Sequence, residues 1–389
     1  MEVKQIYEIM NSITNELLGE SVIVQEDLSN IVELGQQFEN VVGLDNYVRK
    51  LPDHIGRVVF VNRTYSSRVP SVLMDGWEYG SIMEKIAARI PEAVENEEWQ
   101  LQDGASYDPD VFHAPDVFGS FWNKRVTFEI DMSITEDQVK SSFSSVTQLN
   151  GFMSMILNAI ENSLSIKLDS LIMRTINNMI GETFYAEVPG GTYTGRSGAK
   201  AVNVLCLYNQ AMYGSDTSNY LTKAAALHTP EFIRFASYTM ANYIDRLKVA
   251  NTLFNIGGEM RFTPGDMLHV VMLAEFKNAA DIYLQSDVFH NEYTALPNAE
   301  SVAFWQGSGT GYAFDDTSKI DIKTASGHAV EADGIIGIMF DRDALGVCNQ
   351  ERKVNTHYNE KASFWNYFYK QFAGYFNDTN EQFVVFYVA

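Results

Sequence analysis

Hydrophobic side chains follow a helical period most clearly between residues 146 and 180. Apolar residues recur there at spacings of three and four, and no proline interrupts them, which predicts one continuous α-helix. At 1.5 Å per residue this helix is roughly 50 Å long, more than a compact small domain requires. A coiled coil is the weaker alternative, because the apolar spacing drifts instead of holding a strict heptad. We therefore expect a central spine helix.

The N-terminal part of the chain alternates between helical and extended patterns. Residues 5–18 and 28–38 have apolar positions along one helical face. Residues 55–69 alternate β-branched and polar residues, which predicts a strand. The sequence SIMEKIAARI, residues 81–90, predicts a further helix. Residues 92–116 are acidic and rich in turn formers, so we expect an exposed, projecting loop.

The rest of the chain predicts a mixed α/β region followed by a terminal sheet. WNKRVTFEIDMSI, residues 122–134, is the expected return strand after the loop. DMLHVVMLAEF, residues 266–276, predicts a strand, and residues 278–290 predict a helix. Glycines and aspartates between 303 and 334 predict loops, and the apolar run GIIGIMFD that ends at Asp341 predicts a buried strand.

The last 29 residues, 361–389, are the most aromatic part of the chain. Eleven of them are Phe, Tyr or Trp, and their full burial removes on the order of 2,000 Å² from water. At roughly 25 cal/mol per Å² this amounts to about 50 kcal/mol as an upper bound, against about 45 kcal/mol for ordering the segment. The free energy gained by burial and the cost of ordering nearly cancel, so the segment is stable only when both of its faces are buried. A strand inside one core and a contact with another subunit are both open interpretations.

Composition narrows the class of protein. The 28 basic and 50 acidic residues give a net charge of −22, which argues against a protein that neutralises phosphates non-specifically. Cys206 and Cys348 match no disulfide or zinc spacing, so we expect buried apolar residues in a reducing compartment. A charge interrupts the first residues where a signal peptide is apolar, and no run reaches the roughly 18 residues of a membrane span. We expect a soluble, cytoplasmic protein.

Two stretches invite a nucleotide-binding interpretation. PGGTYTGRSG, residues 189–198, has the glycine spacing of a phosphate loop, and Asp341 follows an apolar strand as a magnesium-binding aspartate does. However, Arg196 stands where that loop requires lysine, and Pro189 stands where a central strand should enter it. A nucleotide hydrolase is therefore the least favoured function.

Other candidate chemistry is weaker still. Ser308 lies between two glycines but lacks the context of a nucleophile elbow. The seven histidines are scattered, and His269, inside an apolar strand, is expected to be a satisfied core residue. We expect a solvated loop, not an ion site, at five acidic residues without calcium-loop spacing. The sequence thus predicts no enzyme, no catalytic residue, no cofactor and no metal. The five acidic residues are Asp315, Asp316, Asp321, Glu331 and Asp333.

The order of elements resembles the major capsid proteins of tailed bacteriophages, which have the Hong Kong 97 type fold, and most closely those of short-tailed phages of the phi 29 kind. Three pieces carry the resemblance: DNYVRKLPDHIGRVVFVN, ITEDQVKSSFSSVTQLNGFMSMILNAIENS and DRDALGVCNQERKVNTHYNEKASFWNYFYKQFAGYF. It extends from about residue 45 to the end of the chain and is least clear over 200–330. Cellular cargo shells, the encapsulins, share this fold and are the alternative.

The resemblance implies an α+β fold with a defined division of the chain. It implies pentamers and hexamers that close into an icosahedral head around double-stranded DNA, without sequence-specific contacts to that DNA. The further partners implied are a separate scaffolding protein and a portal protein, with assembly in the host bacterial cytoplasm and no membrane contact. The expected parts are an N-terminal helical arm at 1–61, an extended loop at 62–125, a peripheral domain at 126–200 that holds the spine helix 146–180, an axial domain at 201–340, and peripheral return strands at 341–389.

Aromatic side chains are the candidate contact residues between subunits, because large aromatics are common anchors in interfaces. Some relatives join their subunits through a lysine and an asparagine. Lys85 lies in the loop region, but its sequence surroundings show no catalytic carboxylate, so we expect no cross-link. The expected interface residues are Trp77, Trp99, Trp122, Trp365, Tyr367 and Tyr369.

Overall fold

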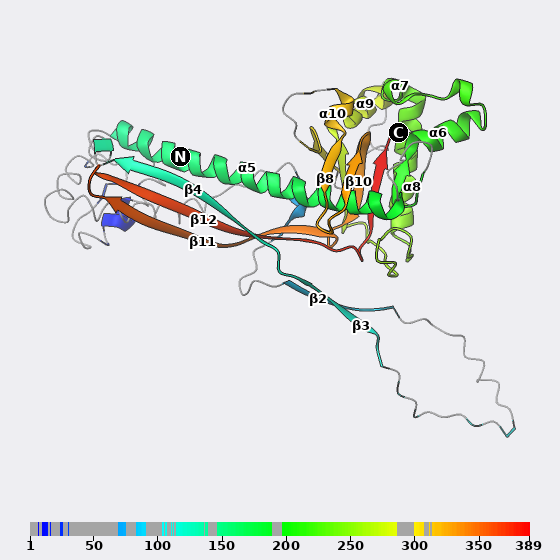
Figure 1. The fold of residues 1–389 in the computed structure, drawn as a ribbon, viewed down its shortest axis with the longest axis horizontal. Helices are drawn as coiled ribbons and strands as arrows, with labels where there is room; N and C mark the ends of the chain where they lie inside the picture. Colours follow the sequence, from blue (N-terminus) through cyan, green and yellow to red (C-terminus); the bar gives the residue numbers. More distant parts are fainter. Residues whose placement is uncertain are drawn as a thin grey trace.

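The computed structural model describes residues 69–74, 83–90, 114–135, 146–188, 197–285, 299–306 and 313–389, together with short pieces and single positions between Tyr7 and Gly311. Helix α5, Val146–Glu187, runs along the long strands of one sheet and continues to a second sheet (Figure 1). The spine helix expected at 146–180 is confirmed, and it extends seven residues further. Two groups of elements are thus joined by one helix.

The first group is a four-stranded sheet in the order β1-β11-β12-β4. Strand β12 lies between β11 and β4 and pairs antiparallel with both. Its burial alternates along most of its length, as expected of a strand with one face against the core, and α5 contacts β4, β11 and β12. The return strand predicted at 122–134 is confirmed as β4. The bounds are β1 Leu73–Met74, β4 Arg125–Thr135, β11 Leu345–Asn359 and β12 Phe364–Asn377.

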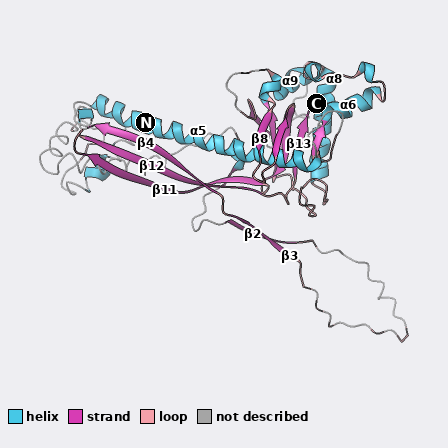
Figure 2. Cartoon of the chain, in the orientation of Figure 1, coloured by secondary structure: helices cyan, strands magenta, loops and turns pink. Residues whose placement is uncertain are grey.

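The second group is a five-stranded sheet in the order β5-β13-β10-β6-β7 with helices around it (Figure 2). All seven residues of β10 are buried. Ile338 packs in one core with the C-terminal half of α5, and Met339 packs in another with α8, so both faces of β10 are covered. This confirms the buried strand predicted to end at Asp341. The bounds are β5 Ala201–Asn203, β6 Leu268–Leu273, β7 Ala299–Val302, β10 Ile335–Asp341 and β13 Phe383–Tyr387.

Short helices and a hairpin complete this second group. The loops predicted over 303–334 are wrong in part, because this region contains helix α10 and the antiparallel pair β8–β9. The strand predicted at 266–276 ends earlier, and the following helix begins at Ala274. The bounds are α6 Val204–Tyr213, α7 Lys223–Ala226, α8 Pro230–Leu247, α9 Ala274–Gln285, α10 Phe314–Thr317, β8 Ile320–Lys323 and β9 Ala329–Ala332, with 3-10 turns at Pro70–Val72 and Thr217–Asn219.

The helix predicted for 81–90 is wrong. Residues Met83–Ala88 form strand β2, which pairs antiparallel with β3, Val117–Trp122. The sequence MEKIAA has good intrinsic helix propensity, but pairing with β3 and the contacts of Lys85 with the body of the protein outweigh it. The helical residues described between Tyr7 and Glu16 agree with the helix predicted at 5–18. Most of the helix at 28–38, most of the strand at 55–69 and most of the loop at 92–116 lie outside the described residues, and Asn30 is described in a turn.

Candidate functional site

Strands β2 and β3 form a ribbon that leaves the body of the protein beside the start of β4 and the end of β12 (Figure 1). The register runs from Met83 opposite Trp122 to Ala88 opposite Val117. Directly opposed residues of an antiparallel pair share one face, so the ribbon has two distinct faces. We call the face with Lys85 and Trp122 the docked face, and the face with Ile86 and Phe121 the outer face.

Lys85 anchors the docked face to the body. Its Nζ lies 2.6 Å from Glu381 Oε1 and 3.1 Å from Asp378 Oδ2, and both carboxylates are largely buried. Burial lowers the pKa of Lys85, but the hydrogen bonds and charges of Glu381 and Asp378 outweigh it and raise the pKa above its ordinary value. The ammonium is thus held charged, with both acidic partners supplied by the turn before β13.

Aromatic contacts extend this anchor along the ribbon. The indole N–H of Trp122 donates to the carbonyl of Asn377 at 3.2 Å, and its ring lies 5.2 Å from that of Phe376. Further out, Arg89 forms an ion pair with Glu259 at 3.0 Å. The guanidinium of Arg261 lies over the ring of Phe118 at 5.3 Å. The docked face is therefore fixed to the body at several points.

The outer face includes Glu84, opposite Phe121 in the register, and apolar side chains that are exposed in the single chain. Ile86 is 68% exposed, Phe121 64% and Val117 58%. The ring of Phe121 lies over Gly119, which stands opposite Ile86 in the register. Large exposed apolar side chains on one face of a short ribbon indicate a candidate interaction surface.

The predicted interface residues divide into three sets. Trp77 and Trp99 lie outside the described residues. Trp122 is half-buried on the docked face of the ribbon, against its own chain. Trp365, Tyr367 and Tyr369 are 3%, 0% and 4% exposed within one chain, which makes them core residues of the subunit; a part in subunit contacts stays a prediction for all six. Sequence reasoning missed the outer face of the ribbon, because it assigned those residues to a helix.

The chemical motifs do not assemble into a reactive centre in the described parts of the chain. Most of the glycine-rich loop lies outside them. Asp341 is buried, accepts a hydrogen bond from the N–H of Asp343 at 2.9 Å, and has a raised pKa because of its burial. The Nδ1 atom of His269 is buried without a described partner, so the satisfied core histidine was a wrong prediction; burial, together with Arg342, lowers its pKa.

Three of the acidic residues between 315 and 333 form ion pairs with lysine side chains, among them Glu331 with Lys319. Lys223 lies between Asp315, at 2.6 Å, and Asp333, at 2.9 Å. Among the described residues, no group of three or more His, Cys, Asp or Glu could hold a metal ion. Cys206 and Cys348 are free and buried, which confirms that part of the prediction. No described helix is long and apolar enough to cross a bilayer.

The family assignment rests on sequence. A profile of the family described as Phi29-like phage major capsid protein matches residues 10–387. The chain belongs to this family. A search of curated protein sequences finds no match.

One solved structure supports the fold of this capsid protein, and a second has a lower TM-score. A chain in the structure of the head fiber and inner core protein gp22 of native bacteriophage P68 is 7% identical, with a TM-score of 0.50 over 83% of this chain and 85% of that one. A chain in the capsid structure of Staphylococcus phage Andhra is 8% identical, with a TM-score of 0.48 over 82% and 83%. At such low identity the likeness shows the fold alone. The α+β fold of the Hong Kong 97 type is confirmed, and the capsid protein is a structural component of the virion.

The structure corrects the expectation that Lys85 has no carboxylate nearby, since Glu381 and Asp378 both contact it. The sequence around Lys85 does not show these partners, because they lie almost 300 residues further along the chain. A protonated lysine is a poor nucleophile, and both carboxylates hold Lys85 in that state. This arrangement therefore gives no reason to predict a covalent cross-link at Lys85.

Proposed function

We propose that this capsid protein assembles into pentamers and hexamers that close into an icosahedral head around double-stranded phage DNA, without catalysing a reaction. The observation that carries the proposal is the two-faced ribbon, docked on its own body through one face and exposing apolar side chains on the other. Exposed apolar side chains are unfavourable in water, so a neighbouring copy that covers them stabilises the assembly. When one surface of each copy binds a different surface of the next copy, the copies form a ring if the rotation between neighbours closes the circle.

The division of labour within the subunit follows from this geometry. We assign the arm to residues 1–61, the extended loop to 62–125 around the ribbon, the peripheral domain to 126–200 and 341–389, and the axial domain to 201–340. The four-stranded sheet and α5 support the peripheral assignment for 126–200 and for β11 and β12, whereas β13 lies in the five-stranded sheet. The helices around the five-stranded sheet support the axial one (Figure 2).

The partners follow from charge as well as from the family. The net charge of −22 disfavours tight binding of the packaged DNA to the shell, and screening limits this repulsion to about 8 Å at physiological salt. We propose that a separate scaffolding protein directs assembly in the host bacterial cytoplasm, and that a portal protein occupies one vertex. Closed shells formed by this chain alone would contradict the need for a scaffold.

The outer face gives the direct test of assembly. The double substitution Ile86→Ser and Phe121→Ser removes two of the exposed apolar side chains and touches no docked contact. We expect the purified chain to keep its unfolding midpoint and to lose shell formation, measured by sedimentation of particles co-expressed with scaffold. Tyr238→Ser is the control, because this side chain is also exposed, at 65%, but lies on α8. Equal loss of particles in both variants would contradict the role of the ribbon.

A further inference from the structure

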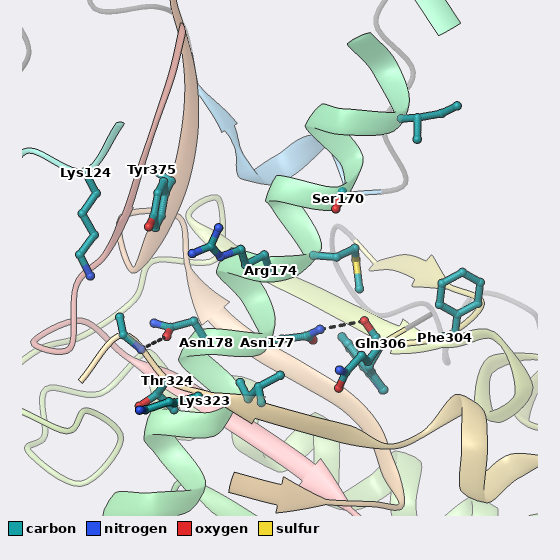
Figure 3. Close-up of a pocket in the computed structure, with 15 residues that line it drawn as sticks. Lys124, Ser170, Arg174, Asn177, Asn178, Phe304, Gln306, Lys323, Thr324 and Tyr375 are labelled. Atoms are coloured by element: carbon teal, nitrogen blue, oxygen red, sulfur yellow. Dashed lines mark hydrogen bonds between the residues drawn. The ribbon is translucent and has the colours of Figure 1, made fainter. Parts of the chain in front are cut away.

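A pocket of about 770 Å³ lies across the middle of α5. Its wall also includes the end of β8, the segment that follows β7, and the end of β12. Its volume is in the range of small-molecule sites, about 300–1,000 Å³. Figure 3 shows Lys124, Arg174 and Tyr375 on one side of α5 and Phe304 on the other. The pocket, which we call the α5 pocket, thus has a cationic end and an apolar end.

Three cations line the cationic end: Lys124 between β3 and β4, Arg174 on α5, and Lys323 in β8. The guanidinium carbon of Arg174 lies 5.7 Å from the ring centroid of Tyr375, and the N–H of Tyr375 donates to the carbonyl of Lys124 at 3.4 Å. None of the described residues forms an ion pair with these cations, and no carboxylate is among the described residues of the lining. Such a set favours a multiply charged anion, and a guanidinium matches the geometry of phosphate.

The apolar end is formed by Ile166, Met173 and Phe304. Ile166 and Met173 are seven residues apart and therefore share one face of α5. Ile166 is 66% exposed and Phe304 36% exposed. The adjacent Trp305 is buried, and its indole N–H donates to the carbonyl of Ile335 at 2.9 Å, which fixes this part of the wall. A flat aromatic group would cover these side chains, since bases stack favourably on aromatic rings.

A buried amide next to the apolar end adds a further requirement. Asn177 is only 5% exposed, and its Nδ2 donates to the carbonyl of Trp305 at 2.9 Å. Its Oδ1 has no hydrogen-bond partner in the described structure, and the residue lines the pocket. A buried acceptor without a partner is costly, so a ligand that carries an N–H beside its aromatic group fits best. The bases of nucleotides carry such donors on their edges.

We propose that the α5 pocket binds a nucleoside phosphate, either a free nucleotide or a nucleotide within a single strand of nucleic acid. The phosphates lie at the cationic end, and the base packs against Phe304 at the apolar end. The described lining holds no carboxylate to bind magnesium or activate water, so we expect binding without hydrolysis. The pocket includes neither the described residues of 189–198 nor Asp341, and it is therefore distinct from the motif that sequence reasoning disfavours.

Calorimetric titration of the full unassembled chain with ADP in magnesium-free buffer tests the cationic end. We expect saturable binding that weakens about tenfold or more, or about 1.4 kcal/mol, in Arg174→Gln and in Lys323→Gln, because each loses a charge-assisted contact with phosphate. Both side chains are exposed, so an unchanged urea midpoint is expected. Lys167→Gln is the matched control, because it removes an exposed charge from α5 outside the pocket. Equal weakening in the control would show general charge attraction and overturn the site.

A second pair of variants tests the apolar end. Phe304→Ala is expected to weaken ADP binding about tenfold and to leave pyrophosphate binding unchanged, because pyrophosphate has no base. Tyr238→Ala, an exposed aromatic residue on α8 outside the pocket, is the control and is expected to change neither. Pyrophosphate or a triglutamate peptide that binds as tightly as ADP would overturn the assignment to a nucleoside phosphate.

Competition with a single-stranded oligonucleotide distinguishes the two sources of the ligand. Displacement of ADP at a lower concentration of strands assigns the pocket to nucleic acid, provided that Arg174→Gln weakens both ligands. ADP binding that the oligonucleotide leaves unchanged assigns the pocket to a free nucleotide. Absence of saturable binding for both ligands would overturn the inference. None of these titrations requires shells, so failure of the proposed assembly would leave their outcome independent.

Discussion

At the scale of single residues, Lys85 holds the ribbon through two carboxylates that the fold brings to it. Its side chain is 23% exposed, against 3% for Asp378 and 11% for Glu381. Removal of one partner of a mostly buried pair leaves unpaired charge behind, and this is more destabilising than the pair itself is stabilising. The anchor is therefore sensitive to loss of the ammonium.

Lys85→Met keeps the aliphatic stem and removes the charge. We expect the free energy of unfolding to fall by about 2 kcal/mol at neutral pH, measured by urea denaturation of the unassembled chain. The raised pKa means that this contribution is complete below the ordinary value of 10.5 and is lost as pH rises through the folded-state value. Lys361→Met, an exposed residue in the turn between β11 and β12, is the control. Equal effects in the two variants would contradict the anchor.

A second prediction concerns Asp341, a buried acidic residue. Burial raises the pKa of this carboxyl, so the folded state favours the protonated form, and the stability associated with it is present below the ordinary value of 3.8 and lost as pH rises. Asp341→Asn removes the buried charge and keeps an oxygen to accept the N–H of Asp343. We expect a higher urea midpoint at pH 7 and a gain that disappears toward pH 4. A gain independent of pH would contradict this cause.

Residue types alone could predict some of these environments and not others. Cys206 and Cys348 were expected to be buried, because a cysteine without a spacing motif behaves as a small apolar residue. The partners of Lys85 could not be predicted, since they lie almost 300 positions away in the chain.

At the scale of elements, the local pattern of apolar residues gives the correct prediction where an element has a clear apolar signal of its own. The apolar period of α5 and the continuous apolar run of β10 each identify their element. The pattern failed for β2, where a short segment of good helix formers is held as a strand by β3 and by the body. It also missed the β8–β9 hairpin, whose strands are only four residues long.

Gly334 shows how tightly the elements of the five-stranded sheet meet. It has φ +74°, and a Cβ there would lie 2.1 Å from the carbonyl oxygen of Val388. Gly327 also has a positive φ, +93°, but open space around it. We expect Gly327→Ala to cost about 1 kcal/mol and Gly334→Ala at least about 2 kcal/mol more, because backbone must move. The two urea midpoints measure the difference, and equal losses would contradict the close approach.

At the scale of the whole molecule, the structure shows where the most aromatic segment of the chain is buried. Strand β12 places Trp365, Tyr367 and Tyr369 in the core of the long sheet, and β13 is buried within the second sheet. Exposed apolar side chains of the ribbon, Ile86, Val117 and Phe121, lie outside both of these buried segments. Sequence order was enough to suggest the family, whereas the two faces of the ribbon arise only from the folded arrangement.

Electron microscopy of particles from the full chain co-expressed with a candidate scaffolding protein tests the central claim most directly. The account predicts closed shells built from rings of five and six copies, in which the outer face of each ribbon is covered by a neighbouring copy. A preparation that stays monomeric with several scaffolds, or shells in which Ile86 and Phe121 remain exposed to solvent, would contradict it.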